Sequence, residues 1–148
     1  MVLKRVLHFS SLFTEIYAIN LFKKIRTTGL KAILLKPGDI LLGAHYTDKD
    51  DLIMLVADNG KAIKFSESDV RERFRGTLGV KGINLSKNSK LVSIIKPCGG
   101  EIITVTENGY GNRVSIENYN TQKRGGVGVI GIKTSTRNGK VVGAVNVG

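Results

Sequence analysis

The second half of the chain repeats itself at a fixed spacing, and this repeat limits the possible folds more than any other feature. Arg75–Leu85 (RGTLGVKGINL) aligns with Arg124–Thr134 (RGGVGVIGIKT), and six identical residues stand 124 − 75 = 49 positions apart. The Asn-Gly pairs that end at Gly60 and Gly109 are separated by the same 109 − 60 = 49 positions. Self-similarity at this period predicts a chain built from successive copies of one small structural unit.

Each unit has the pattern of four short strands. Two apolar runs around Asn-Gly predict a β-hairpin, with both turn residues at positive φ as in a type I′ turn. A polar loop, the segment Arg-Gly-x-x-Gly-Val and a final apolar run such as Leu91–Ile95 supply the remaining strands. Four strands at this period favour the blade of a propeller over a sandwich, which would not repeat. We therefore predict an all-β, propeller-like domain of roughly three consecutive blades, with repeats at about residues 1–45, 46–96 and 97–148.

The first unit departs from this pattern. RTTGLKAILL (Arg26–Leu35) and ILLGA (Ile40–Ala44) match the later copies, but no Asn-Gly pair precedes them. Arg5 stands 21 residues before Arg26, against 11 between Lys64 and Arg75, so we expect an insertion and a missing opening hairpin. The apolar residues of the insertion fall loosely on one side of a helix, which favours a short helix there. We interpret the chain as an incomplete ring cut from a longer array, because a closed ring needs about 4–8 blades.

The chain is strongly basic. Its 23 Lys and Arg residues outnumber 12 Asp and Glu residues, which gives a formal net charge of +11 over 148 residues. This exceeds the magnitude of about 2–8 that suits a small soluble domain. Nucleic acid is therefore the expected partner, and a surface made soluble by lysine is the alternative. With no Trp and 6% aromatic residues, the chain lacks a base-stacking set, so we expect contact with phosphates rather than with bases.

Other classes of protein fit the composition poorly. One cysteine, Cys98, excludes an intramolecular disulfide, and two histidines without cysteine partners do not make a metal site. No apolar run reaches the roughly 18–20 residues of a membrane helix. We expect a cytoplasmic protein with no membrane contact and no cofactor in this chain.

The segment Gln122–Gly128 (QKRGGVG) is the first candidate for phosphate contact. Its glycines let a phosphate approach backbone N–H groups, while Lys123 and Arg124 neutralise the charge. In the alternative interpretation the glycines only shape a tight turn. If every blade presents its cations on the same rim, a bent DNA duplex meets one basic patch per blade. The residues that we assign to this DNA-binding rim are Gln122, Lys123, Arg124, Gly125, Gly126, Gly128, Arg75, Arg113, Lys133, Lys61, Lys64, Arg26 and Lys31.

Several longer motifs resemble a known family. ENGYGNRV, VRERFRGTLGVKGINL and RNGKVVGAV are similar to the C-terminal domain of bacterial DNA gyrase A subunits, and in part to that of topoisomerase IV A subunits. The resemblance begins at about Ile25. It implies a six-bladed β-pinwheel in which neighbouring blades exchange strands. It also implies that DNA wraps around a basic outer rim, which allows gyrase to introduce negative supercoils at the expense of ATP.

QKRGGVG resembles a Gln-Arg-Arg-Gly-Gly-Lys-Gly box that this family needs for wrapping. Val127 replaces the Lys of the box, and the flanking sequence is typical of a late blade rather than the first, which indicates a degenerate copy. The resemblance implies three partners: duplex DNA, the gyrase B subunit and the rest of the gyrase A subunit. It also implies a nucleoid location. In this family the DNA-cleaving tyrosine lies in an N-terminal domain and ATP binds the B subunit, so this chain is expected to bind and bend DNA without catalysis.

Two other functions remain open at this point. One is the same role in topoisomerase IV, and the other is a propeller scaffold that binds an acidic protein. A catalytic domain is disfavoured, because neither histidine stands with a plausible nucleophile and carboxylate set.

Overall fold

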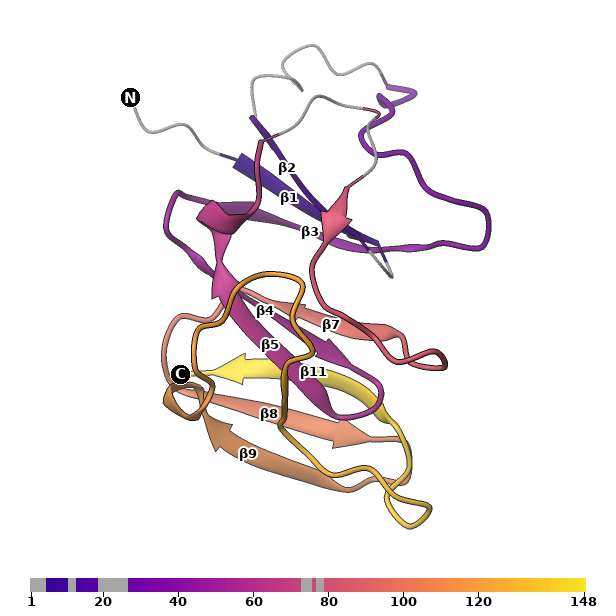
Figure 1. Ribbon diagram of the computed structural model, residues 1–148, viewed down its shortest axis with the longest axis vertical. Helices are drawn as coiled ribbons and strands as arrows, with labels where there is room; N and C mark the ends of the chain where they lie inside the picture. The colour runs from indigo at the N-terminus through magenta and orange to yellow at the C-terminus, as the bar shows by residue number, and fades with distance from the viewer. Residues whose placement is uncertain (1–4, 11–12, 19–26, 73–75, 77–78) are drawn as a thin grey trace.

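The protein is a stack of three antiparallel β-sheets. The computed structural model describes residues 5–10, 13–18, 27–72, 76 and 79–148. In Figure 1 the sheets follow one another along the long axis of the molecule, in the order of the chain. The strands are β1 (Arg5–Ser10), β2 (Phe13–Ala18), β3 (Leu41–Thr47), β4 (Leu52–Ala57), β5 (Lys61–Ser66), β6 (Val80–Lys81), β7 (Leu91–Ile95), β8 (Glu101–Thr106), β9 (Gly111–Ser115), β10 (Val129–Ile130) and β11 (Val141–Val147). Two 3₁₀ turns, η2 (Glu67–Asp69) and η3 (Ile116–Asn118), follow β5 and β9. The all-β architecture predicted from the repeat is confirmed.

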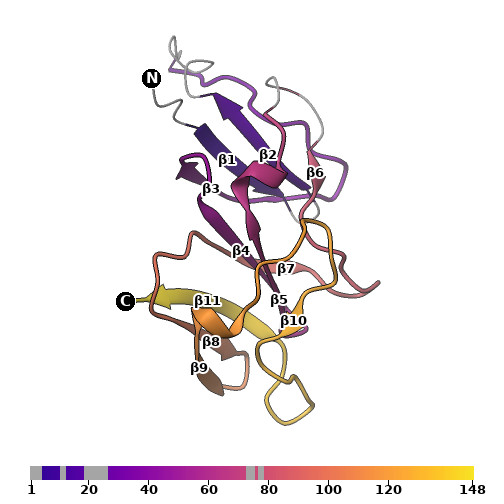
Figure 2. The same cartoon turned by 60° about the vertical axis from the view of Figure 1, so that its left-hand side comes forward.

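Neighbouring repeats exchange an edge strand. The strand orders are β3-β1-β2-β6, β10-β5-β4-β7 and β11-β8-β9. Figure 2 shows β6 beside β2 and β10 beside β5, although each comes from the repeat that follows. Val80 pairs with Thr14, and Val129 pairs with Ala62. We call β6 and β10 donor strands, because each completes the sheet of the preceding repeat, as the family resemblance implies.

The Asn-Gly turns differ from the predicted type I′ geometry. In the second repeat β4 and β5 pair up to Val56 and Ala62, and Gly60 N–H donates to the Ala57 carbonyl at 3.1 Å. Gly60 lies at φ 83°, whereas Asn59 is not at positive φ. Glu107–Gly109 repeats this arrangement, with Gly109 at φ 81°. The prediction was wrong because the loop has three residues, and such a loop is commonly a type I turn followed by one left-handed residue.

The first repeat contains the hairpin that the sequence analysis considered missing. β1 and β2 pair antiparallel, with Phe9 opposite Thr14, and β1 also pairs with β3. The predicted short helix is therefore wrong, and the apparent insertion forms the two central strands of the first sheet. Its aromatic and β-branched residues favour a pleated strand once ladders form on both sides. The same one-residue bulge interrupts the outer ladder of all three sheets, at Phe9/Ser10, Val56/Ala57 and Val141/Gly143.

The core lies between the sheets, in two layers. Ile53, Leu55, Phe65 and Leu91 pack on the side of the first sheet, and partly buried Leu42 and Val80 join them. The other layer is made by Met54, Val56, Ala62, Ile95, Ile102, Ile116, Tyr119 and Val141. Strand β4 is buried on both faces, which explains why LIMLVA is a continuous apolar run rather than an alternating one.

Candidate nucleic-acid interface

The QKRGGVG loop is fastened to the strands of the preceding repeat. Gln122 N–H donates to the Lys64 carbonyl at 2.7 Å, and Gly125 N–H donates to the Gly82 carbonyl at 2.8 Å. In return the Asn84 N–H donates to the Gly126 carbonyl at 2.8 Å. The loop therefore lies across the end of β5 and against the chain that leaves the donor strand β6.

The glycines of this loop serve close packing. Gly125 and Gly128 lie at φ 83° and 73°, where a side chain is strained. A Cβ on Gly128 would stand 2.5 Å from the Ala62 carbonyl oxygen, which no side chain can do. Because the Gly125 N–H is already donated to a carbonyl, this glycine does not offer it to a phosphate. The geometry of these two glycines agrees with the turn-shaping alternative.

Lys123 and Arg124 have different surroundings. The Lys123 side chain is 95% exposed, and its Nζ lies 4.0 Å from Asp69 Oδ1. The Arg124 guanidinium donates to two backbone carbonyls, from Nε to Asp69 at 3.1 Å and from Nη1 to Lys81 at 2.6 Å. Arg124 thus holds the loop against β6 while keeping its charge near the surface, and Lys123 is the cation that projects.

A row of cations follows the donor strands along the stack. Gly76 N–H donates to the Ala32 carbonyl at 2.8 Å, as Gly125 does to Gly82, so successive repeats are joined in the same way. Lys31 and Lys81 immediately precede these two acceptors, and both are exposed. Figure 2 shows β6 and β10 on the same side of the stack. We call Lys31, Lys81 and Lys123 the cationic row.

Lys81 was missed in the sequence analysis. It stands 50 positions after Lys31 in aligned segments, RTTGLK and RGTLGVK, and this match was the available signal. The third copy has Ile130 at that place, which hid the pattern. In the structure the Lys81 carbonyl accepts from Arg124, so Lys81 stands directly beside QKRGGVG.

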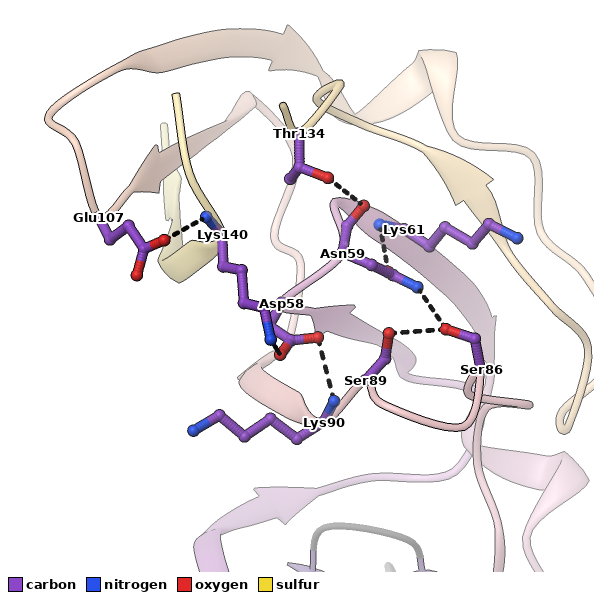
Figure 3. A network of polar contacts seen from close by, with 9 residues as sticks. All are labelled: Asp58, Asn59, Lys61, Ser86, Ser89, Lys90, Glu107, Thr134 and Lys140. Carbon is purple, nitrogen blue, oxygen red and sulfur yellow. Dashed lines mark hydrogen bonds and ion pairs between the residues drawn. The ribbon is translucent and has the colours of Figure 1, made fainter. Parts of the chain in front are cut away.

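Lys64 is not on the rim. It is 7% exposed, and its Nζ donates to the Ile116 carbonyl at 3.1 Å, across the boundary between the second and third sheets. The placement expected from the sequence is wrong because an exposed lysine was assumed at a strand position that the next repeat covers. Lys61, three residues earlier, is half-buried beside the Asn59 turn (Figure 3).

The remaining candidates are dispersed. Arg113 on β9 is exposed and ion-paired with Glu101 on β8, so part of its charge is neutralised. Lys133 is exposed in the loop after β10. Two candidates, Arg26 and Arg75, lie outside the described residues.

A polar network keeps the second and third repeats at a fixed spacing. Figure 3 shows buried Asp58 between two lysines, accepting from Lys90 N–H at 3.0 Å and lying 3.6 Å from Lys140 Nζ. Thr134 Oγ1 donates to the Asn59 carbonyl at 3.3 Å. Contacts from the third repeat therefore hold the hairpin turn of the second, which keeps the donor strands in register.

The part of the chain that the structure describes contains no cluster of three or more His, Cys, Asp or Glu side chains suited to a metal ion. Over the same residues, no helix has the length and apolar character needed to cross a bilayer.

Comparison with known proteins identifies the family. The model of the DNA gyrase C-terminal domain, beta-propeller, matches residues 18–48, 51–97 and 100–147. The chain belongs to this family. The two later matched segments lie within the second and third repeats. Strand β1 precedes the first matched segment, so the first sheet begins upstream of the residues that match the family model.

Curated relatives support the assignment. The DNA gyrase A subunit of Escherichia coli (strain K12) is 47% identical over 127 residues, which are 85% of this chain and 14% of that protein. The Pseudomonas aeruginosa subunit is 40% identical over 127 residues, with the same coverage of both. The chain thus spans about one seventh of the length of these relatives, and the resemblance predicted from the motifs is confirmed.

Solved structures agree with the fold. The structure of a DNA gyrase A C-terminal domain matches with a TM-score of 0.88 and 27% identity, covering all of this chain and 50% of that one. The C-terminal domain of a DNA topoisomerase IV matches with a TM-score of 0.89 at 24% identity, over 97% of this chain and 46% of that one, which shows the fold alone.

Proposed function

We propose that the chain binds duplex DNA irrespective of base sequence and bends it along the cationic row, as part of a gyrase A subunit. The observation that carries this proposal is that Lys31 and Lys81 precede the two carbonyls that accept the same glycine N–H bond in successive repeats, while Lys123 projects from the loop beside Lys81. Exposed cations that recur with the repeats along one side of the stack match a polyphosphate backbone and provide no base readout.

The role in the whole enzyme follows from the family. In that setting the protein partners are the B subunit together with the remainder of the A subunit. DNA wrapped on the row then supports ATP-dependent negative supercoiling near the nucleoid. The relatives described above are gyrase A subunits, which favours this role over that in topoisomerase IV.

Binding can be tested by fluorescence anisotropy with a labelled duplex of mixed sequence, from about 50 to about 200 mM salt. We expect log K to fall linearly with log salt. Lys81→Gln and Lys123→Gln should each lower the magnitude of that slope by about 1, equally for different sequences. Lys49→Gln is the matched control, because Lys49 is exposed in a turn among Asp48, Asp50 and Asp51 and should not face a polyanion. Affinity that ignores salt, or equal effects of all three variants, would refute the proposal.

Bending requires a separate measurement. A nicked plasmid is ligated with and without the protein, and the linking number is read after deproteinisation. We expect a shift that grows with protein and is smaller for the Lys81→Gln/Lys123→Gln double variant. If the linking number is unchanged at saturating binding, the chain binds DNA without wrapping it, and the bending part of the proposal is refuted.

A further inference from the structure

We propose that the Asp69 carboxylate is an internal counter-ion that competes with DNA phosphates for the QKRGGVG loop. This inference deepens the proposed function and rests on it. It assigns to one acidic side chain the role of limiting how tightly the loop holds a duplex.

The carboxylate lies against the two residues that were expected to receive a phosphate. Asp69 Oδ2 accepts the backbone N–H of Arg124 at 3.4 Å, and Asp69 Oδ1 lies 4.0 Å from Lys123 Nζ. A backbone N–H and an ammonium group are also the contacts that a basic, glycine-rich loop offers to a phosphate. The protein therefore holds its own anion at the place where the sequence analysis expected an anion of the DNA.

The neighbouring N–H groups of the loop have a different kind of partner. Gln122 N–H and Gly125 N–H donate to the main-chain carbonyls of Lys64 and Gly82. The Arg124 N–H thus differs from both, because its acceptor carries a charge. We infer that this part of the loop is the part for which a phosphate competes.

Asp69 is fixed, whereas Lys123 is free to reach outward. The Asp69 side chain is 23% exposed, and its main-chain carbonyl accepts from Arg124 Nε at 3.1 Å. The Lys123 side chain is 95% exposed. A phosphate bound by Lys123 would lie about 7 Å from the fixed carboxylate, and like charges at that distance near a surface lower affinity by about three- to tenfold.

The next repeat shows that the turn does not need this charge. Asn118 stands 118 − 69 = 49 positions after Asp69, at the same place in η3 as Asp69 in η2. Ser66 and Ser115 cap the two turns identically, each accepting the N–H two residues further on at 3.3 Å. Because the same turn forms with an amide, the negative charge of Asp69 serves something other than the local fold.

A purely positioning role for Asp69 can be separated from competition. Asp69→Asn keeps the main-chain carbonyl that accepts from Arg124 Nε, and the new amide oxygen can accept from Arg124 N–H in place of the carboxylate. The substitution therefore removes the charge and preserves the hydrogen-bond acceptors. If positioning were the whole role, DNA affinity would stay the same or fall.

The test is fluorescence anisotropy of a labelled duplex of mixed sequence with the full chain, from about 50 to about 200 mM salt. We expect Asp69→Asn to bind about three- to tenfold more tightly at the lowest salt concentration. The gain should shrink at the highest concentration, because salt screens the repulsion. The plot of log K against log salt is then steeper for Asp69→Asn than for the unsubstituted chain.

Glu117→Gln is the matched control for net charge. Glu117 is an exposed acid in η3, so it lies one repeat further along the stack, and its substitution changes the net charge by the same amount. We expect it to change affinity by less than about twofold, since isolated surface charges beyond a Debye length are screened. Circular dichroism confirms that each variant is folded.

A double-mutant cycle with Lys123 gives the decisive result. In a Lys123→Gln background, Asp69→Asn should gain at most about half as much log K, because the cation for which the anions compete is gone. Lower affinity of Asp69→Asn, a gain no larger than that of Glu117→Gln, or an equal gain in the Lys123→Gln background would each overturn the inference and leave the proposed function standing. Salt-independent binding by the unsubstituted chain would refute the proposed function, and this inference with it.

Discussion

Replacing Gly60 by alanine measures how strongly the exchanged strand holds the stack together. A Cβ at this position stands 2.0 Å from the Ile132 carbonyl oxygen, and φ is 83°. Gly109→Ala is the matched control, because it has the same turn at φ 81° and free space around the Cβ. The control carries only the cost of a left-handed alanine, about 1–2 kcal/mol.

The difference between the two variants comes from the donor segment. The added methyl group at residue 60 displaces Ile132, and the two N–H groups that converge on the Gly60 carbonyl lose their acceptor. At about 1 kcal/mol per hydrogen bond, Gly60→Ala should lose at least about 2 kcal/mol more than Gly109→Ala.

Urea unfolding followed by far-UV circular dichroism tests this difference. With a slope of about 1–3 kcal/mol per molar urea, the midpoints of the two variants should differ by about 1 M. If the two free energies of unfolding agree within about 0.5 kcal/mol, the donor strand does not stabilise the second sheet and the reasoning is refuted.

Three further substitutions separate the roles of individual side chains. Arg124→Lys should cost about 1–3 kcal/mol in urea unfolding, because it removes donors to two carbonyls, and a loss as small as that of Lys123→Gln would contradict this role. Burial raises the pKa of Tyr119 above its usual 10.0, so the unfolded chain loses this proton first and stability should fall as pH rises above about 10. Tyr119→Phe should flatten that fall, and an unchanged pH profile would exclude Tyr119 as its cause. Asp58→Ala should cost about 1–3 kcal/mol by leaving the Lys90 N–H without its acceptor. Lys140→Met should cost less, because the Lys140 side chain is 61% exposed and the buried Asp58 carboxylate keeps its hydrogen bond from the Lys90 N–H. The reverse order in thermal unfolding would refute this reasoning.

The local sequence was sufficient to place the hairpin strands of the second and third repeats, but it did not show which strands of different repeats pair. The 49-residue offset and the apolar runs place β4, β5, β8 and β9, because each hairpin is a contact between neighbours in the chain. Nothing in the local sequence shows whether a strand such as β6 or β10 stays in the sheet of its own repeat or joins the sheet of the preceding repeat. Val129 pairs with Ala62 across 67 residues, and that choice depends on the packing of whole repeats. β1 and β2 were misjudged for the same reason, since their hairpin lacks Asn-Gly and is defined by the ladder to β3.

The candidate site shows a similar limit at the level of side chains. Lys123 could be predicted as exposed because a loop residue between polar neighbours has little to pack against. Lys64 could not be predicted as buried, because the carbonyl that accepts its ammonium belongs to Ile116, 52 positions away in the next repeat. The partners of Arg124 also come from another repeat, at Asp69 and Lys81. In a repeat fold the neighbours of a surface side chain are supplied by the adjacent unit.

Strand exchange links the cationic row to the packing of the sheets. Lys81 lies on the donor strand β6, and Lys31 occupies the aligned position in the first repeat, so the step between these two cations is set by the spacing of packed sheets, about 10 Å at the core and larger at the outer edge. A duplex resists such curvature, since bending 20–30 bp by 40–90° costs of order 1–6 kcal/mol. A few cations on one chain offset only part of that cost. A longer row, built from more repeats of this kind, offsets more of that cost.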